Sequence, residues 1–146
     1  MMGDDFRRDR TAPDLNALLN YGYTVLRAAT ARAVVAAGLH PTIGLHHSNR
    51  GNAFALADDL MEPFRPLVDC CVRGLADRNG TKVDPEAKQT LARLIALDLP
   101  LGGGQSPVTV ALGKLATSLG QSFETGRLSL ALPDPPDALT LAGLGA

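Results

Sequence analysis

Apolar and small residues recur about every 3.6 positions over residues 14–37, which is the spacing of one helix face. Pro13 and Asp14 offer a helix start, and Gly38 offers a C-cap, because glycine readily adopts the left-handed conformation found there. The pattern therefore predicts one long helix from about Asp14 to Ala37. The residues of this stripe are Leu15, Leu18, Leu19, Gly22, Leu26, Ala29, Ala33 and Ala37.

Two prolines interrupt the next apolar segment, which follows a loop over residues 40–51. A second helix is expected from about Asn52 to Phe64. Pro63 and Pro66 predict a kink or a new start there, since proline cannot donate the amide hydrogen bond of a helix interior. The helix then continues from Leu67 to Ala76 and stops at the turn signal Asn79-Gly80.

Two further helix starts contain proline. Asp84-Pro85-Glu86 places an N-cap candidate before a proline in the first turn, and Ser106-Pro107 repeats the signal. The glycine-rich stretch 100–105 between these helices is expected to be a loop, and Gly126 ends the later helix. Residues 127–132 alternate in polarity, which fits either a short strand or an extended docking segment.

These elements predict an all-α protein of five to six helices, with residues 14–132 as the helical domain. Residues 1–13 are polar and lack periodicity, and the proline-rich residues 133–146 are expected to be a flexible tail. A length of 146 residues suits one domain of this kind.

Composition narrows the class of protein. The chain is 45% hydrophobic and 20% charged, which is typical of a globular fold rather than a disordered chain. Its net charge of −1 argues against an all-over basic nucleic-acid binder but leaves room for a local basic patch. The sequence contains no apolar run of about 18 residues, so no membrane span is expected. The adjacent Cys70 and Cys71 suggest reduced thiols in an intracellular protein, and the start MMGDDFRRDR is unlike a signal peptide.

Candidate chemistry is concentrated between His46 and Glu62. Asp59 and Glu62 are three residues apart, so a helix places both carboxylates on one face, and Asp58 shares a face with Glu62 as well. The loop that carries His46 and His47 comes directly before this helix. Carboxylates with an imidazole can hold Mg²⁺ or Mn²⁺ at a phosphodiester. From spacing alone, a pair of loop histidines and a solvated acidic face is the simpler interpretation.

Phosphate contacts have weaker candidates. Arg50 can contact phosphate or serve as a turn residue, and Arg65 can contact phosphate or pair with a helix carboxylate. Gly102-Gly103-Gly104 precedes a helix, but no GK[ST] follows it, so a flexible linker is the better interpretation.

Three ordered stretches give the sequence a specific resemblance. They are FRRDRTAPDLNALLNYGYTVLRAA at 6–29, GLHPTIGLHHSNRGNAFALADDLMEPFRPLVD at 38–69 and ALDLPLGGGQSPVTVALGKLATSLGQSF at 96–123. They resemble the CRISPR-associated endonuclease and integrase of spacer acquisition, especially its type II form. The resemblance runs from about Phe6 to Pro133.

The resemblance implies the family's C-terminal helical domain, with a divalent-metal site that binds Mg²⁺ or Mn²⁺. The family's histidine ligand falls on His47 and its downstream acid on Glu62, which would be the catalytic residues, with Asp59 as a further metal ligand. His46 and Asp58 are then expected either to contact these ligands without binding the metal or to lie on the surface. The implied reaction inserts spacers by transesterification at phosphodiester bonds, with Arg50 and Arg65 as DNA contacts.

The family also has a first glutamate ligand upstream of the LNYGY segment, and this ligand has no match in the chain. The chain has only Glu62, Glu86 and Glu124. The resemblance therefore implies an N-terminally truncated member with impaired activity, in which residues 1–13 are a remnant of the segment between two domains. The family's β-rich N-terminal domain has no match either.

The resemblance implies partners too. These are double-stranded DNA, as prespacer and CRISPR repeat, and a small ferredoxin-fold adaptation partner. Full-length members form homodimers through the N-terminal domain, so this chain is not expected to form stable dimers. The implied location is the prokaryotic cytoplasm, without a membrane partner. The alternative function is a non-catalytic DNA-binding or assembly fragment of the adaptation complex.

Overall fold

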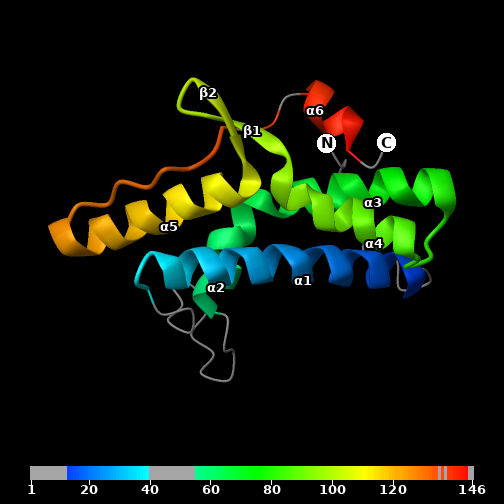
Figure 1. Ribbon diagram of the computed structural model, residues 1–146, viewed down its shortest axis with the longest axis horizontal. Helices are drawn as coiled ribbons and strands as arrows, with labels where there is room; N and C mark the ends of the chain where they lie inside the picture. The colour runs from blue at the N-terminus through cyan, green and yellow to red at the C-terminus, as the bar shows by residue number, and fades with distance from the viewer. Residues whose placement is uncertain (1–12, 40–54, 135, 137, 145–146) are drawn as a thin grey trace. The chain divides into compact units, whose positions relative to one another are not determined.

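The computed structural model describes residues 13–39, 55–134, 136 and 138–144 (Figure 1). Six α-helices and one two-stranded sheet lie in this part of the chain, so the predicted all-α class with five to six helices is confirmed. The elements in chain order are α1 (Pro13–Ala36), α2 (Ala55–Met61), the 3₁₀ turn η1 (Glu62–Phe64), α3 (Arg65–Asn79), α4 (Pro85–Ala92), the 3₁₀ turn η2 (Arg93–Ala96), β1 (Asp98–Leu101), β2 (Gly104–Pro107), α5 (Val108–Thr125) and α6 (Ala138–Gly143).

The chain forms two compact units that share α1. The first unit takes residues 1–25, 64–94 and 136–146, and the second takes residues 26–63 and 95–135. No helix of the described residues is long and apolar enough to cross a membrane. The boundaries predicted from the sequence for a helical domain at 14–132 stay a prediction.

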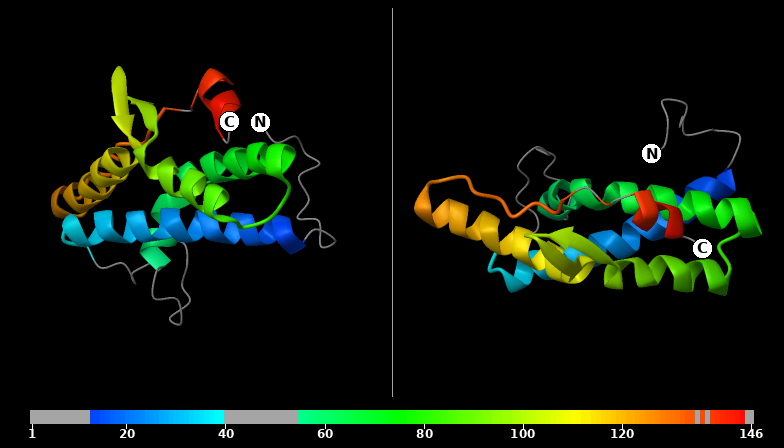
Figure 2. Two further views of the ribbon diagram at one scale, coloured as in Figure 1. Left: turned by 45° about the vertical axis from the view of Figure 1, so that its right-hand side comes forward. Right: turned by 90° about the horizontal axis from the view of Figure 1, so that it is seen from above.

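In the first unit, the beginning of α1 packs closely on α3 and α4. A Cβ atom added to Gly22 would lie 2.6 Å from Cγ1 of Val68 and 3.3 Å from Cδ2 of Leu91. Only a glycine permits so close an approach of the α1 backbone. α6 lies against α3 in this unit, as Figure 2 shows from two further sides.

Local signals in the sequence set the ends of α3 and α4 as predicted. Pro66 lies in the first turn of α3. Gly80 ends that helix: it has a φ of 73°, and its amide donates a hydrogen bond to the Ala76 carbonyl. Asp84 caps α4 by accepting a hydrogen bond of 2.8 Å from the Ala87 amide. The expected break near Pro63 is confirmed as η1, although the predicted helix start at Asn52 lies outside the described residues.

In the second unit, α5 packs against α2 and the hairpin. The predicted loop at 100–105 is wrong, because β1 and β2 form an antiparallel hairpin there with Leu101 opposite Gly104. Gly102 and Gly103 form its two-residue turn with φ of 60° and 83°, and positive φ at both positions is what such a tight hairpin needs. Leu99 is buried on one strand of the hairpin, and Ser106 is buried opposite it on the other.

The start of α5 also differs from the prediction. Ser106 belongs to β2 rather than to a helix cap, and Pro107 is the N-cap without a side-chain hydrogen bond. The Val108 amide instead donates to the Leu97 carbonyl at 2.8 Å. The end of α5 is as predicted, since Gly126 adopts the left-handed conformation with a φ of 70°.

The segment after α5 is extended and is not part of a strand in the described residues. Side chains of α5 hold it: the Ser122 hydroxyl accepts from the Ser129 amide at 3.0 Å, and the Ser118 hydroxyl accepts from the Ala131 amide at 2.9 Å. Of the two alternatives for residues 127–132, the structure therefore has the docking segment. The short helix α6 that follows was not predicted from the proline-rich composition.

Candidate functional site

The acidic residues predicted from the sequence lie on α2 and at the start of η1. α2 has only seven residues, and Leu56 and Leu60 are among those it buries. A helix of this length is marginal by itself in water, so its packing in the second unit stabilises it. α5 is one element that it packs against. The placement of the acids therefore depends on tertiary contacts.

Asp58 points inward and is held by Arg27 of α1. Nε of Arg27 donates to Oδ1 of Asp58 at 2.7 Å, and Nη2 donates to Oδ2 at 3.1 Å. The Asp58 side chain is 7% exposed, whereas that of Arg27 is 44% exposed. Two parallel charge-assisted hydrogen bonds are the strongest and most directional form of such a pair. Asp58 is thus not on the surface, which was one of its two predicted places.

Asp59 and Glu62 differ from Asp58 in burial. Asp59 is half-buried and Glu62 is exposed, although all three acids come from one short segment. The Arg27 guanidinium binds both carboxylate oxygens of Asp58, whereas Asp59 and Glu62 lie nearer to solvent. Their roles as metal ligands stay a prediction.

His46, His47 and Arg50 lie outside the described residues, so the structure does not test their predicted roles. Among the residues that are described, no group of three or more His, Cys, Asp or Glu side chains can hold a metal ion. Asp59 and Glu62 supply two hard oxygen donors, and His47 is the predicted nitrogen donor. This donor chemistry fits Mg²⁺ or Mn²⁺, both of which favour carboxylate oxygen.

Arg65 lies at the start of α3 in the first unit. Its guanidinium carbon lies 5.3 Å from the centroid of the Tyr23 ring, which is a cation–π distance. The Tyr23 hydroxyl donates to Oδ1 of Asp69 on the same helix. Arg65 is half-buried, and its predicted DNA contact stays a prediction.

A family model described as CRISPR associated protein Cas1 matches residues 5–94, which is more than half of the chain. The chain belongs to the Cas1 family. The family predicted from the LNYGY, GLHH and DLMEPFRP segments is therefore confirmed.

Curated relatives support this assignment to the Cas1 family. The CRISPR-associated endonuclease Cas1 of Neisseria meningitidis serogroup C is 37% identical over 121 residues, which are 81% of this chain and 39% of the relative. A CRISPR-associated exonuclease Cas4/endonuclease Cas1 fusion of Geobacter sulfurreducens is 43% identical over 82 residues, 54% of this chain and 15% of that protein. The chain thus spans about two fifths or less of the length of these relatives.

A solved structure shares the fold. A casposase bound to integration product superimposes with a TM-score of 0.66 and 24% sequence identity, over 87% of this chain and 42% of that one. At 24% identity, this similarity supports only the fold of the present chain.

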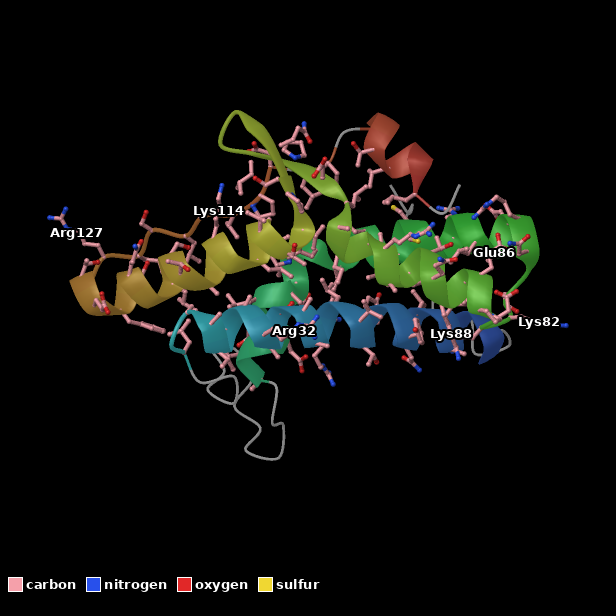
Figure 3. The ribbon with its side chains drawn as sticks, in the orientation of Figure 1. Arg32, Lys82, Glu86, Lys88, Lys114 and Arg127 are labelled. Carbon is pink, nitrogen blue, oxygen red and sulfur yellow. The ribbon has the colours of Figure 1, made fainter. Side chains whose placement is uncertain are left out.

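Basic side chains of the second unit lie at the surface of this Cas1-family chain. Lys114 and Arg127 extend outward from α5 and from the segment after it, and Arg32 is exposed on α1 (Figure 3). These side chains add local positive charge to a chain whose net charge is −1.

Sequence reasoning missed Arg27 as a residue of the site. It is 31 residues from Asp58, and no local spacing connects two positions so far apart. Tyr23 was missed as the partner of Arg65 for the same reason, although its place in the LNYGY segment draws attention to it.

Proposed function

We propose that this chain is the helical, metal-binding part of a metal-dependent DNA endonuclease and integrase of CRISPR adaptation. The observation that carries the proposal is the different burial of the three acids in residues 57–62, the ADDLME segment. Arg27 neutralises the inward-pointing Asp58, whereas Asp59 and Glu62 lie nearer to solvent. Membership of the Cas1 family, whose curated relatives are named endonucleases, supports the same function.

His47, Asp59 and Glu62 would hold a Mg²⁺ or Mn²⁺ ion in this proposal. When bound, the metal polarises a phosphoryl oxygen and stabilises the leaving oxygen of a transesterification. Asp59 and Glu62 contribute negative charge on one short segment, and His47 contributes a neutral nitrogen. The helical turns of α2 and η1 limit the reorganisation of the two carboxylates.

Double-stranded DNA is the proposed substrate, as prespacer and CRISPR repeat. The casposase that shares the fold is named as bound to integration product, which supports a DNA partner. Arg50 and Arg65 are the proposed phosphate contacts, since arginine binds phosphate through a planar fork. A small ferredoxin-fold adaptation protein is the proposed protein partner, and a homodimer is proposed for full-length members.

We expect the 146-residue chain to bind metal weakly and to turn over slowly when assayed by itself. Its three glutamates are Glu62, Glu86 and Glu124, of which only Glu62 is in the ADDLME segment. With the family's first glutamate unmatched in this sequence, the site lacks one carboxylate ligand, which removes one oxygen donor and one negative charge from the implied set. Weak occupancy at low metal concentration follows from this.

The test combines Mn²⁺ titration with a Mn²⁺-dependent DNA cleavage assay on wild type, Glu62→Ala and Glu124→Ala. Glu124 is an exposed acid on α5, so its substitution removes the same charge outside the site. Glu62→Ala should weaken Mn²⁺ binding and abolish residual cleavage, while Glu124→Ala should match wild type.

Each other outcome of this test has a distinct meaning. Robust cleavage by wild type that disappears in Glu62→Ala would contradict the expected weak activity while supporting the nuclease site. Mn²⁺ binding that is the same in Glu62→Ala and wild type would contradict the metal site. DNA binding without any effect of Mn²⁺ or of Glu62→Ala would support the non-catalytic assembly alternative instead.

A further inference from the structure

We infer that Arg27 is a positioning residue for the proposed metal carboxylates, and that it acts by fixing the rotation of α2 through Asp58. The inference rests on the function proposed above. It assigns a role to a residue of α1 that is not itself one of the proposed ligands.

A helix as short as α2 needs contacts from other elements to set its rotation. α2 has seven residues, too few to hold a fixed direction by itself. The apolar side chains that α2 buries, among them Leu56, Leu60 and Met61, select which face of the helix points inward, but the hydrophobic effect itself has no direction. The fork of Arg27 is directional, because two hydrogen bonds of 2.7 and 3.1 Å must be satisfied together.

The Asp58 carboxylate is confined by its burial and by its ion pair. Its side chain is 7% exposed, and Arg27 supplies this buried carboxylate with positive charge and two hydrogen-bond donors. The ion pair therefore keeps Asp58 pointing toward α1. Consecutive residues of an α-helix lie about 100° apart around its axis. Fixing Asp58 thus fixes the direction of the next residue, Asp59, and it limits the freedom of Glu62, which begins the 3₁₀ turn η1 directly after α2.

A charge effect and a positioning effect of Arg27 change the metal affinity in opposite directions. If Arg27 acted only through its charge, removing it would strengthen the binding of a cation nearby, because a repulsive positive charge is lost. If Arg27 acts by positioning, removing it weakens the binding, because the carboxylates lose their common orientation. Metal affinity therefore separates the two roles.

The experiment is a Mn²⁺ titration of the full 146-residue chain up to the millimolar range, followed by the electron paramagnetic resonance signal of free Mn²⁺. All variants are compared at a temperature at which circular dichroism shows each of them folded. Arg27→Gln should bind Mn²⁺ about tenfold more weakly than wild type, the lower end of what loss of a supporting partner does to a metal site. Arg32→Gln removes the same charge from an exposed position of α1 and should bind as wild type does.

A second variant keeps the positive charge at position 27 and removes the pair of parallel hydrogen bonds to Asp58. Arg27→Lys retains a cation beside Asp58, so the buried carboxylate stays compensated and the fold is preserved. We expect about threefold weaker Mn²⁺ binding, because one ammonium cannot make the bidentate contact. Wild-type affinity in Arg27→Gln or in Arg27→Lys overturns the inference. A lower melting temperature with unchanged Mn²⁺ affinity also overturns it, since that result shows a structural role alone.

Glu62→Ala separates this inference from the proposed function. If Glu62→Ala leaves Mn²⁺ binding unchanged, the proposed metal site is wrong, and the proposed role of Arg27 in positioning its ligands is wrong as well. If Glu62→Ala weakens Mn²⁺ binding and the Arg27 variants do not, the metal site stands and only the positioning role is wrong.

Discussion

The hydroxyl of Tyr23 on α1 donates a hydrogen bond to Oδ1 of Asp69 on α3, across 46 residues of sequence. The guanidinium of Arg65 lies over the same tyrosine ring, and Arg65 and Asp69 are one helical turn apart on α3. The ring of Tyr23 thus meets a cation, and its hydroxyl meets the anion of the following turn. Both contacts join the first half of α1 to α3 within one compact unit.

Removing the Tyr23 hydroxyl should destabilise the fold. Tyr23→Phe keeps the ring beneath Arg65 but leaves the part-buried Asp69 carboxylate without this donor. A hydrogen bond to a charged group contributes about 1.5–3 kcal/mol, so we expect the free energy of unfolding to fall by roughly that amount. Urea denaturation followed by circular dichroism measures the change.

Tyr21→Phe is the matched control for Tyr23. Tyr21 is two residues away on α1, and its ring lies 5.9 Å from Nζ of Lys88, a contact that phenylalanine preserves. We expect this change to alter the unfolding free energy by less than about 0.5 kcal/mol. Equal effects of the two substitutions would show that the Asp69 hydrogen bond is not the cause.

The glycine at position 22 should not tolerate a methyl group. Alanine normally stabilises a helix relative to glycine by about 1 kcal/mol. At Gly22, however, the new Cβ would lie 2.6 Å from Cγ1 of Val68, so either the buried Val68 side chain or the helices themselves must shift. Overpacking of this kind costs about 1–3 kcal/mol, and Gly22→Ala should lower the unfolding free energy by that much in urea denaturation.

Gly113→Ala tests the same substitution without the close contact. Gly113 is in α5, and a Cβ atom there meets no atom within 4 Å. We expect this variant to be more stable than wild type by about 0.4–1 kcal/mol. The pair of substitutions should thus differ in sign, and a stabilising Gly22→Ala would refute the tight packing of α1 on α3.

Burial of Cys71 should make stability depend on pH in the alkaline range. Desolvation raises the pKa of its thiol from 9.0 to about 11, with a smaller opposing effect of Arg78. Between these two values the unfolded chain loses a proton that the folded chain keeps. The unfolded state then binds fewer protons, so stability is complete below about pH 9 and falls as pH rises toward 11.

Urea denaturation across this pH range measures the effect. A shift of two pKa units corresponds to about 2–3 kcal/mol lost by the upper end of the range. Cys71→Ala should have a flatter pH profile than wild type, whereas Cys70→Ala should keep most of the wild-type slope, because Cys70 is the smallest of the three causes of the raised pKa of Cys71. Identical slopes in all three proteins would mean that the Cys71 thiol does not titrate differently in the folded state.

Several helix ends could be predicted from the sequence because their causes act within one turn. Asp84 caps α4 through the amide of Ala87, three residues later. Gly80 and Gly126 end their helices because each takes a positive φ, which glycine adopts without steric strain. The same local chemistry placed Asp59 and Glu62 on one short helical segment.

The hairpin at 98–107 could not be predicted in the same way. Gly102 and Gly103 fit a linker as well as a turn, and the strands on either side have only four residues each. What selects the hairpin is the burial of Leu99 and Ser106 and the packing of both strands on α5. Those contacts are made with the helix that follows the hairpin, so the turn residues by themselves do not reveal them.

The sequence by itself determined the helical class, most helix boundaries, the acids of the ADDLME segment and the family. Tertiary structure alone decided that Asp58 is the acid buried against Arg27, while Asp59 and Glu62 lie nearer to solvent. The physical reason is that a helix repeat sets only the relative directions of neighbouring side chains. Which direction faces inward depends on the partner across the fold, and here that partner is an arginine 31 residues away.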